Sequence, residues 1–310
     1  MFQMWMFHGK ESHVQENQLS RRKMEGDYMK TVLIGASDIY DWSKVKNWIK
    51  SARQTGFGGD IVLLTYRITN PQEFLANCER YNVNVFSIEH DAFGNPIQHT
   101  AGGRDTQCHQ LRFFHAWQFL HDNHDQYDNV IMTDVRDVIF QKNPQEYLQQ
   151  YINEDLIISS ESITFGNEPW NANNMVLGFG PFFREISIDW TVYNVGVLAG
   201  KSVVLKNLFL TIYNSTVGRY IPSDQSSFNI LLREGILGNH LAHTDHANDW
   251  ACQCGTTLDP EKIHYRTRLT DPVPEIKDGI VYNTAGQPFH IVHQYDRVPE
   301  LSSYIERLYA

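Results

Sequence analysis

The feature that most constrains the fold is an alternation of short apolar runs with segments of helical periodicity near the start of the chain. The alternating segments are residues 30–37, 41–57, 60–66, 70–82 and 83–88. The apolar runs are short and almost uninterrupted, as expected for strands buried on both faces. Strand, helix, strand, helix, strand is the order of a parallel sheet with right-handed crossovers. The chain is therefore predicted to be α/β, with a mostly parallel sheet flanked by helices.

Downstream segments continue the same alternation. Helices are expected at residues 109–123, 201–217, 223–235 and 299–309, and strands at 129–133, 155–162, 191–200, 279–283 and 289–295. Residues 90–106 and 163–186 are rich in Gly, Asn and Pro, so both are expected to be irregular. Residues 1–28 are polar and lack periodicity, so they are interpreted as a tail or leader. Residues 29–310 contain no linker-like composition and are predicted to form one domain.

Composition excludes several functional classes. A 310-residue chain that is 42% hydrophobic has ample material for a core. Its formal charge of −10 repels nucleic acids and anionic lipids. No apolar run is long enough to span a membrane, no signal peptide is recognised, and four scattered cysteines favour a reducing compartment. A cytoplasmic protein without a membrane span is predicted, and its oligomeric state is not indicated.

The string "NVIMTDVRDVIFQKNP", residues 129–144, places two acids at the end of a predicted buried strand. In an open parallel sheet, ligands bind outside the carboxyl ends of the strands. Residues three apart on a strand face opposite sides, so Asp134 and Asp137 share a ligand only if the chain turns between them. Two carboxylates brought together in this way would suit Mg²⁺ or Mn²⁺. The alternative is a turn cap with an Asp–Arg surface pair.

Common signatures of nucleotide-binding and hydrolytic enzymes are absent from the sequence. The chain has no G-x-x-x-x-G-K-[ST] phosphate loop, no G-x-G-x-x-G after the first strand and no G-x-S-x-G elbow. Residues 129–144 instead resemble the DxD-type segment of GT-A glycosyltransferases. The strings "TVLIGASDIYDW", "YNVGVLAG", "SDQSSFN" and "FHIVHQYDR" resemble, in order, further motifs of these enzymes. The resemblance spans residues 30 to 300 and implies a single GT-A type domain with a Rossmann-like sheet.

The resemblance also implies a function and a metal site. It indicates a glycosyltransferase that uses Mn²⁺ or Mg²⁺ to move a sugar from a nucleotide-sugar donor to an acceptor hydroxyl, with a glycan or glycoconjugate as acceptor. Asp134, Asp137 and His293 match the metal residues, and Asp134 also matches a donor residue that reaches the ribose. His290 would fall on the opposite face of an extended strand from His293.

Donor binding is expected at the end of the first strand and beside the metal. Ala36, Ser37 and Asp38 follow the first apolar run, where the nucleotide would lie. Arg104 and Arg112 precede the metal strand, and guanidinium groups suit phosphate. Surface ion pairs are an equally good interpretation of both arginines.

Acceptor binding and catalysis are predicted from fewer signals. An inverting transferase needs a carboxylate base, for which Asp224 and Asp189 are candidates; a retaining enzyme does not. Asn194 and Gly196 match the Asn-x-Gly motif, and Gln225 the Asp-Gln helix. Trp170 could stack on a sugar ring, although a tryptophan is more often in the core. The sequence indicates neither the sugar nor the stereochemistry.

Three rival interpretations stay open. The same acids could serve a metal-dependent phosphoester hydrolase, which would ordinarily show more ligands. The chain could bind carbohydrate without turnover. A separate zinc site is conceivable where five potential ligands gather, although the C-x-C spacing is unusually tight. These ligands are His240, His243, His246, Cys252 and Cys254.

Overall fold

The computed structural model describes residues 29–97, 106–123, 125–219, 221–235, 237, 240–243 and 248–310. The predicted leader, residues 1–28, and Arg104 lie outside the described residues. Across the described part of the chain, none of the helices combines the length and apolar character that crossing a membrane requires.

The predicted alternation at the start of the chain is present in the structure. Its elements are β1 (Thr31–Ser37), α2 (Trp42–Gln54), β2 (Asp60–Thr65), α3 (Pro71–Arg80) and β3 (Val83–Ser87). They are followed by α4 (Thr106–Asp122) and β4 (Asn129–Thr133). β1 pairs in parallel with both β2 and β4, and β2 pairs in parallel with β3. A helix follows each of β1, β2 and β3 along the chain and provides the crossover that parallel pairing needs.

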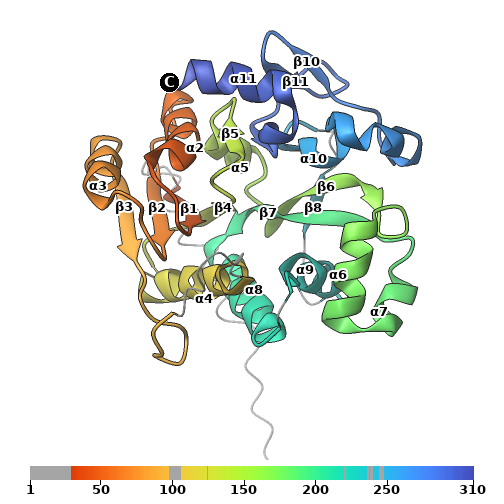
Figure 1. The fold of residues 1–310 in the computed structure, drawn as a ribbon, viewed down its shortest axis with the longest axis horizontal. Coiled ribbons are helices and arrows are strands. Elements are labelled where there is room, and N and C mark those ends of the chain that lie inside the picture. The colour runs from red at the N-terminus through yellow and green to blue at the C-terminus, as the bar shows by residue number, and fades with distance from the viewer. Residues whose placement is uncertain are drawn as a thin grey trace, which may run out of the picture.

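The central sheet is mostly parallel, as predicted, and the described residues give it seven strands in the order β3-β2-β1-β4-β7-β6-β8 (Figure 1). The later elements are β6 (Leu156–Thr164), β7 (Thr191–Lys201), α8 (Ser202–Thr216), α9 (Asp224–Arg233) and β8 (Leu241–His243). β7 runs antiparallel to both of its neighbours, β4 and β6. Its residues therefore reach the carboxyl end of β4 from the opposite direction.

A smaller three-stranded sheet, in the order β5-β12-β9, lies beside the central sheet. Its strands are β5 (Val138–Phe140), β9 (Ala251–Gln253) and β12 (Ile291–His293). The surrounding elements are α5 (Pro144–Gln150), α10 (Cys254–Thr257), η1 (Pro260–Arg268), β10 (Glu275–Lys277), β11 (Ile280–Tyr282), η2 (Tyr295–Arg297) and α11 (Pro299–Leu308). Strands from three distant parts of the sequence thus meet in one short sheet.

Helices cover both faces of the central sheet (Figure 1). Val32 and Ile34 of β1 pack in one core cluster with residues of α4, α8 and α9. Leu33, which points to the other face, packs with residues of α2, α3 and α5. Burial on both faces explains why the strands are almost wholly apolar in sequence.

The expectation that residues 163–186 are irregular was wrong. Strand β6 continues to Thr164, and two helices follow, α6 (Pro169–Phe179) and α7 (Pro181–Ile186). Both begin with proline, and the side chain of Glu168 caps α6 by accepting a hydrogen bond from the Asn171 amide at 2.6 Å. Proline at the first helical position and an acidic cap are helix-start signals that outweighed the scattered Gly and Asn.

Candidate functional site

The chain turns between the two aspartates, as their sharing of one ligand requires. It leaves the central sheet at the end of β4 and enters the small sheet at β5, so residues 134–137 form the connection. Val135 anchors this turn in the core, where it is 2% exposed and packs in the cluster that contains Trp48. It lies so close to Gly35 of β1 that a β carbon there would be 2.3 Å from Val135 Cγ1.

The turn brings Asp134 and Asp137 together with His293, the last residue of β12. One potential ligand atom from each of the three lies within 4.8 Å of the other two. His293 Nε2 is 3.3 Å from Asp134 Oδ2 and 3.7 Å from Asp137 Oδ1. The side chain of Asp134 is 33% exposed, whereas those of Asp137 and His293 are nearly buried. This metal triad, Asp134, Asp137 and His293, is therefore open to solvent on the Asp134 side.

The electrostatics of the metal triad favour a cation. Burial, together with the charge of Asp134, raises the pKa of Asp137. Burial acts against ionisation of Asp134 as well, but Arg112 and His293 hold its pKa well below the usual value. Burial lowers the pKa of His293, but the two carboxylates outweigh it and raise that pKa. A divalent cation would replace a proton between these groups and relieve the repulsion between the carboxylates.

His293 is oriented by a hydrogen bond at its other ring nitrogen. Its Nδ1 lies 2.7 Å from Gln253 Oε1, and the buried Nε2 has no hydrogen-bond partner of good geometry. An orphaned buried nitrogen facing two carboxylate oxygens is the arrangement expected of a metal ligand. Sequence analysis did not identify Gln253, which lies between two cysteines in a strand that it did not predict.

Arg112 of α4 links the metal triad to helix α9. Its guanidinium pairs with Asp134 Oδ1 and, at 3.0 Å, with Asp224 Oδ2. Arg112 is 8% exposed, so the interpretation as a surface ion pair was wrong for this residue. Since Asp224 is the first residue of α9, one buried cation holds the ends of two elements together.

A buried carboxylate that the sequence analysis missed lies on the β7 side of the metal triad. Glu161 of β6 accepts hydrogen bonds from Asn194 at 2.8 Å and Gln225 at 2.9 Å, and longer ones from Asn171 and Thr256 at 3.3 Å. Its signal was similar to the one that identified Asp134, because Glu161 is an acid near the end of the strand predicted at residues 155–162. The structure therefore brings two predicted acceptor residues, Asn194 and Gln225, to one buried charge.

Gly196 is the point of closest approach between β7 and the metal triad. A β carbon at this position would lie 2.5 Å from His293 Cε1, 2.8 Å from Asp134 Oδ2 and 2.9 Å from Asn194 Oδ1. The backbone oxygen of Gly196 also accepts a hydrogen bond from the Asp134 amide at 2.8 Å. A glycine is required here because the ligands of the metal triad pack directly against its α carbon.

The predicted donor residues at the end of β1 lie at the edge of the sheet where β4 ends. Strand β1 pairs with β4 up to Gly35 and Thr133, so Ala36 and Ser37 extend past the end of β4. Asp38 forms two 2.7 Å hydrogen bonds with Arg67. Burial, with a smaller contribution from Asp134 and Asp137, raises the pKa of Tyr40 in the loop after β1, although the charge of Arg136 opposes the shift.

Two predicted residues stand apart from the metal triad. Asp189 is exposed in the turn between α7 and β7, and Trp170 is 55% exposed on the outer face of α6. Within the described part of the chain, no hydrogen bond or ion pair joins either residue to the metal triad.

The alternative zinc site gains no support from the cysteines. Cys252 and Cys254 are buried in a core cluster, with their Sγ atoms 3.7 Å apart. Among the residues that the structure describes, the metal triad is the one group of three or more acidic, His or Cys side chains that could hold a cation. His246 and the side chain of His243 lie outside the described residues.

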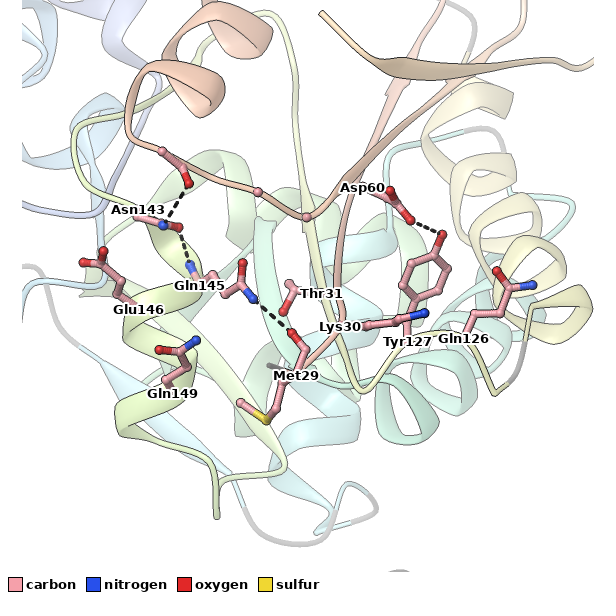
Figure 2. Close-up of a pocket in the computed structure, with 13 residues that line it drawn as sticks. Met29, Lys30, Thr31, Asp60, Gln126, Tyr127, Asn143, Gln145, Glu146 and Gln149 are labelled. Carbon is pink, nitrogen blue, oxygen red and sulfur yellow. Dashed lines mark hydrogen bonds between the residues drawn. The ribbon is translucent and has the colours of Figure 1, made fainter. Parts of the chain in front are cut away.

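A cavity of about 600 Å³ lies at the opposite edge of the sheet from the metal triad. It is lined by residues at the amino ends of β1 and β2, including Thr31 and Asp60, and by the start of α5 (Figure 2). Figure 2 shows that neighbouring residues already satisfy several of its polar groups, such as Tyr127 donating to Asp60 at 2.8 Å. Because ligands of parallel sheets bind at the carboxyl ends of strands, this cavity is separate from the candidate site.

Comparison with known families agrees with the geometry. A family model described as nucleotide-diphospho-sugar transferase matches residues 72–262, which include both aspartates of the metal triad, Glu161 and Gln253. His293 lies beyond the matched residues. No curated protein matches the chain.

Proposed function

The chain belongs to the nucleotide-diphospho-sugar transferase family, and from this we propose that it is a metal-dependent glycosyltransferase. It would move a sugar from a nucleotide-sugar donor to an acceptor hydroxyl of a glycan or glycoconjugate. The observation that carries the metal dependence is the convergence of Asp134, Asp137 and His293 within 4.8 Å. A cytoplasmic location, predicted from composition, stays part of the proposal.

The ligand atoms of the metal triad suit Mn²⁺ or Mg²⁺. Two carboxylates supply hard oxygen ligands, and the orphaned Nε2 of His293 supplies a nitrogen. When bound, such a cation neutralises charge that develops on the diphosphate leaving group. The partial exposure of Asp134 leaves one side of the metal triad open to a donor.

Other residues receive roles according to their position. Ala36, Ser37 and Asp38 extend past the end of β4, which supports contact with the nucleotide. Arg112 is bound to two carboxylates, which supports a role in holding Asp134 in place beside the donor.

On the acceptor side, the proposal assigns Asn194 and Gly196 of β7, which lie beside the metal triad, and Gln225 of α9, which shares Glu161 with Asn194. Trp170, exposed on α6, is the proposed residue for stacking on a sugar ring. Asp224 and Asp189 stay the candidates for a base. One oxygen of Asp224 is bound to Arg112, whereas Asp189 is exposed in the turn before β7. An Asp224→Asn variant with wild-type turnover would remove Asp224 from this role.

The test combines metal and donor binding. Calorimetry of a nucleotide-sugar panel with and without Mn²⁺ should identify a donor whose binding needs the metal. Asp137→Ala should weaken Mn²⁺ binding by on the order of 100-fold, because a ligand is lost outright. The matched control is Asp122→Ala, which removes an exposed carboxylate from the end of α4. Equal donor affinity in the two variants, with and without Mn²⁺, would refute the metal assignment.

A further inference from the structure

The amide side chain of Gln253 is in contact with the candidate metal ligand His293, although it has no place in the proposed reaction. We propose that Gln253 is a positioning residue that holds His293 in the tautomer able to bind a cation through Nε2. This inference rests on the metal site of the proposed function. It assigns the role to a neutral side chain that is itself fully buried.

The hydrogen-bond geometry carries the first step. A neutral imidazole has a hydrogen on one nitrogen and a lone pair on the other. Nε2 of His293 faces both carboxylates, so metal binding requires the hydrogen to be on Nδ1. Gln253 Oε1, 2.7 Å from Nδ1, is an acceptor with no hydrogen of its own. The contact therefore stabilises the Nδ1–H tautomer and leaves the Nε2 lone pair directed at the cation position.

The same amide contact serves the protein with and without a cation. With no cation bound, Nδ1 already lies 2.7 Å from Gln253 Oε1, and Nε2 already faces Asp134 Oδ2 and Asp137 Oδ1. The site is thus prepared for a cation without rotation of the imidazole or the amide, which removes a reorganisation cost from binding.

Two further contacts restrict movement of Gln253. Its Nε2 donates to Ser159 Oγ of β6 at 2.5 Å, so the amide spans from the small sheet to the central sheet. Gln253 is also the register partner of His293, because β9 and β12 pair in parallel at these residues. Backbone pairing sets the spacing of the two side chains, and Ser159 holds the far end of the amide.

An amide rather than a carboxylate suits the local charge. Asp134, Asp137 and Glu161 all act on the pKa of His293, so negative charge is already concentrated here. Glutamine supplies the acceptor that orients the imidazole without adding another buried anion. Gln253→Met and Gln253→Glu, whose side chains are of similar length, should therefore differ in Mn²⁺ affinity.

Mn²⁺ alone is the probe, measured by calorimetry and by electron paramagnetic resonance. Gln253→Met keeps the length of the side chain and removes the acceptor, so Mn²⁺ affinity should fall 10- to 100-fold. Gln253→Glu restores an acceptor, so it should bind Mn²⁺ more tightly than Gln253→Met. A merely structural role predicts the reverse order, because Gln253→Glu buries an extra charge. That reverse order would overturn the proposal.

Gln141→Met is the matched control for loss of a partly buried amide. Gln141 follows β5 and makes hydrogen bonds of 2.8 to 3.0 Å with backbone groups of Val281 and Phe289. This variant should lose stability while keeping wild-type Mn²⁺ affinity. An equal loss of affinity in Gln141→Met and Gln253→Met would also overturn the proposal, because it would show a general effect of destabilisation.

A spectroscopic measurement covers the case in which Gln253→Met folds poorly. In protein labelled with ¹⁵N-histidine, the ring nitrogens of neutral, metal-free His293 should report the Nδ1–H tautomer, with the signal assigned by His293→Gln. The Ser159→Ala variant, which frees the amide, should shift this population toward Nε2–H. An Nε2–H tautomer in the wild-type protein would refute the inference. Absence of Mn²⁺ binding by wild type would instead refute the metal site itself.

Discussion

Replacing Gly196 by alanine tests whether β7 sets the geometry of the metal triad. The new β carbon would lie 2.5 Å from His293 Cε1 and 2.8 Å from Asp134 Oδ2. Carbon atoms in contact are ordinarily about 3.5–4.0 Å apart, so His293 or β7 must move by about 1 Å. Metal ligands tolerate errors of only about 0.2 Å in distance. The substitution should therefore disrupt the metal triad without replacing any of its three residues.

The expected loss of Mn²⁺ affinity follows from the steric strain that the alanine side chain introduces. Overpacking costs roughly 1–3 kcal/mol, and the metal-free protein can relieve it by moving His293 and Asp134 apart. Mn²⁺ binding must restore that strain, so affinity should fall on the order of 10- to 100-fold. Gly196 has no positive φ, so alanine adds no backbone strain that would confuse the result.

Calorimetric Mn²⁺ titration of Gly196→Ala is the assay, with melting curves in EDTA to monitor folding. Gly58→Ala is the control, because a β carbon at Gly58 meets nothing within 4 Å and lies at the opposite edge of the sheet. Wild-type Mn²⁺ affinity in a folded Gly196→Ala protein would refute the argument that this contact sets the ligand spacing.

Two further predictions concern stability. Arg112→Met leaves Asp134 and Asp224 without their shared cation, so the free energy of unfolding in urea should fall by about 3 kcal/mol. Adding Asp224→Asn should recover part of this loss. An unchanged urea midpoint in Arg112→Met would contradict the role of Arg112. Burial and Lys142 lower the pKa of His290 to about 4, against about 6.5 in the unfolded chain. Between these values the unfolded chain binds a proton that the folded protein does not, so stability is complete above pH 6.5 and falls by up to about 3 kcal/mol toward pH 4. The free energy of unfolding, measured in urea at several pH values across this range, should depend less steeply on pH for His290→Asn than for wild type. The same pH dependence in both proteins would exclude His290 as its source.

Local sequence patterns were sufficient to predict much of the fold. The alternation of apolar runs and amphipathic segments identified β1, α2, β2, α3 and β3 in order, because buried strands and crossover helices have different hydrophobic periods. Residues 163–186 were missed because their helix-start prolines were given less weight than Gly and Asn. Strand β9, Ala251–Gln253, is too short to show a period, so neither it nor Gln253 was identified.

The site was predictable to the extent that each residue carried a signal of its own. Asp134 and Asp137 were identified as acids that end a buried strand, and the turn between them was required by strand geometry. Glu161 carried a similar signal inside β6 and was overlooked. For Arg112 the sequence left two interpretations, phosphate contact and a surface ion pair, because an arginine on an amphipathic helix is usually at the surface. Only its burial in the structure excluded the surface ion pair.

The sequence by itself determined the α/β class, and it predicted a ligand at the carboxyl end of β4 and a turn after Thr133. These follow from periods and geometry that act over a few residues. Only the tertiary structure decided which distant groups meet there. Arg112 and Asp224 are 112 positions apart, and Gln253 and His293 are 40 apart. Their contacts depend on how β7 and the small sheet pack against β4, and no local pattern encodes that packing.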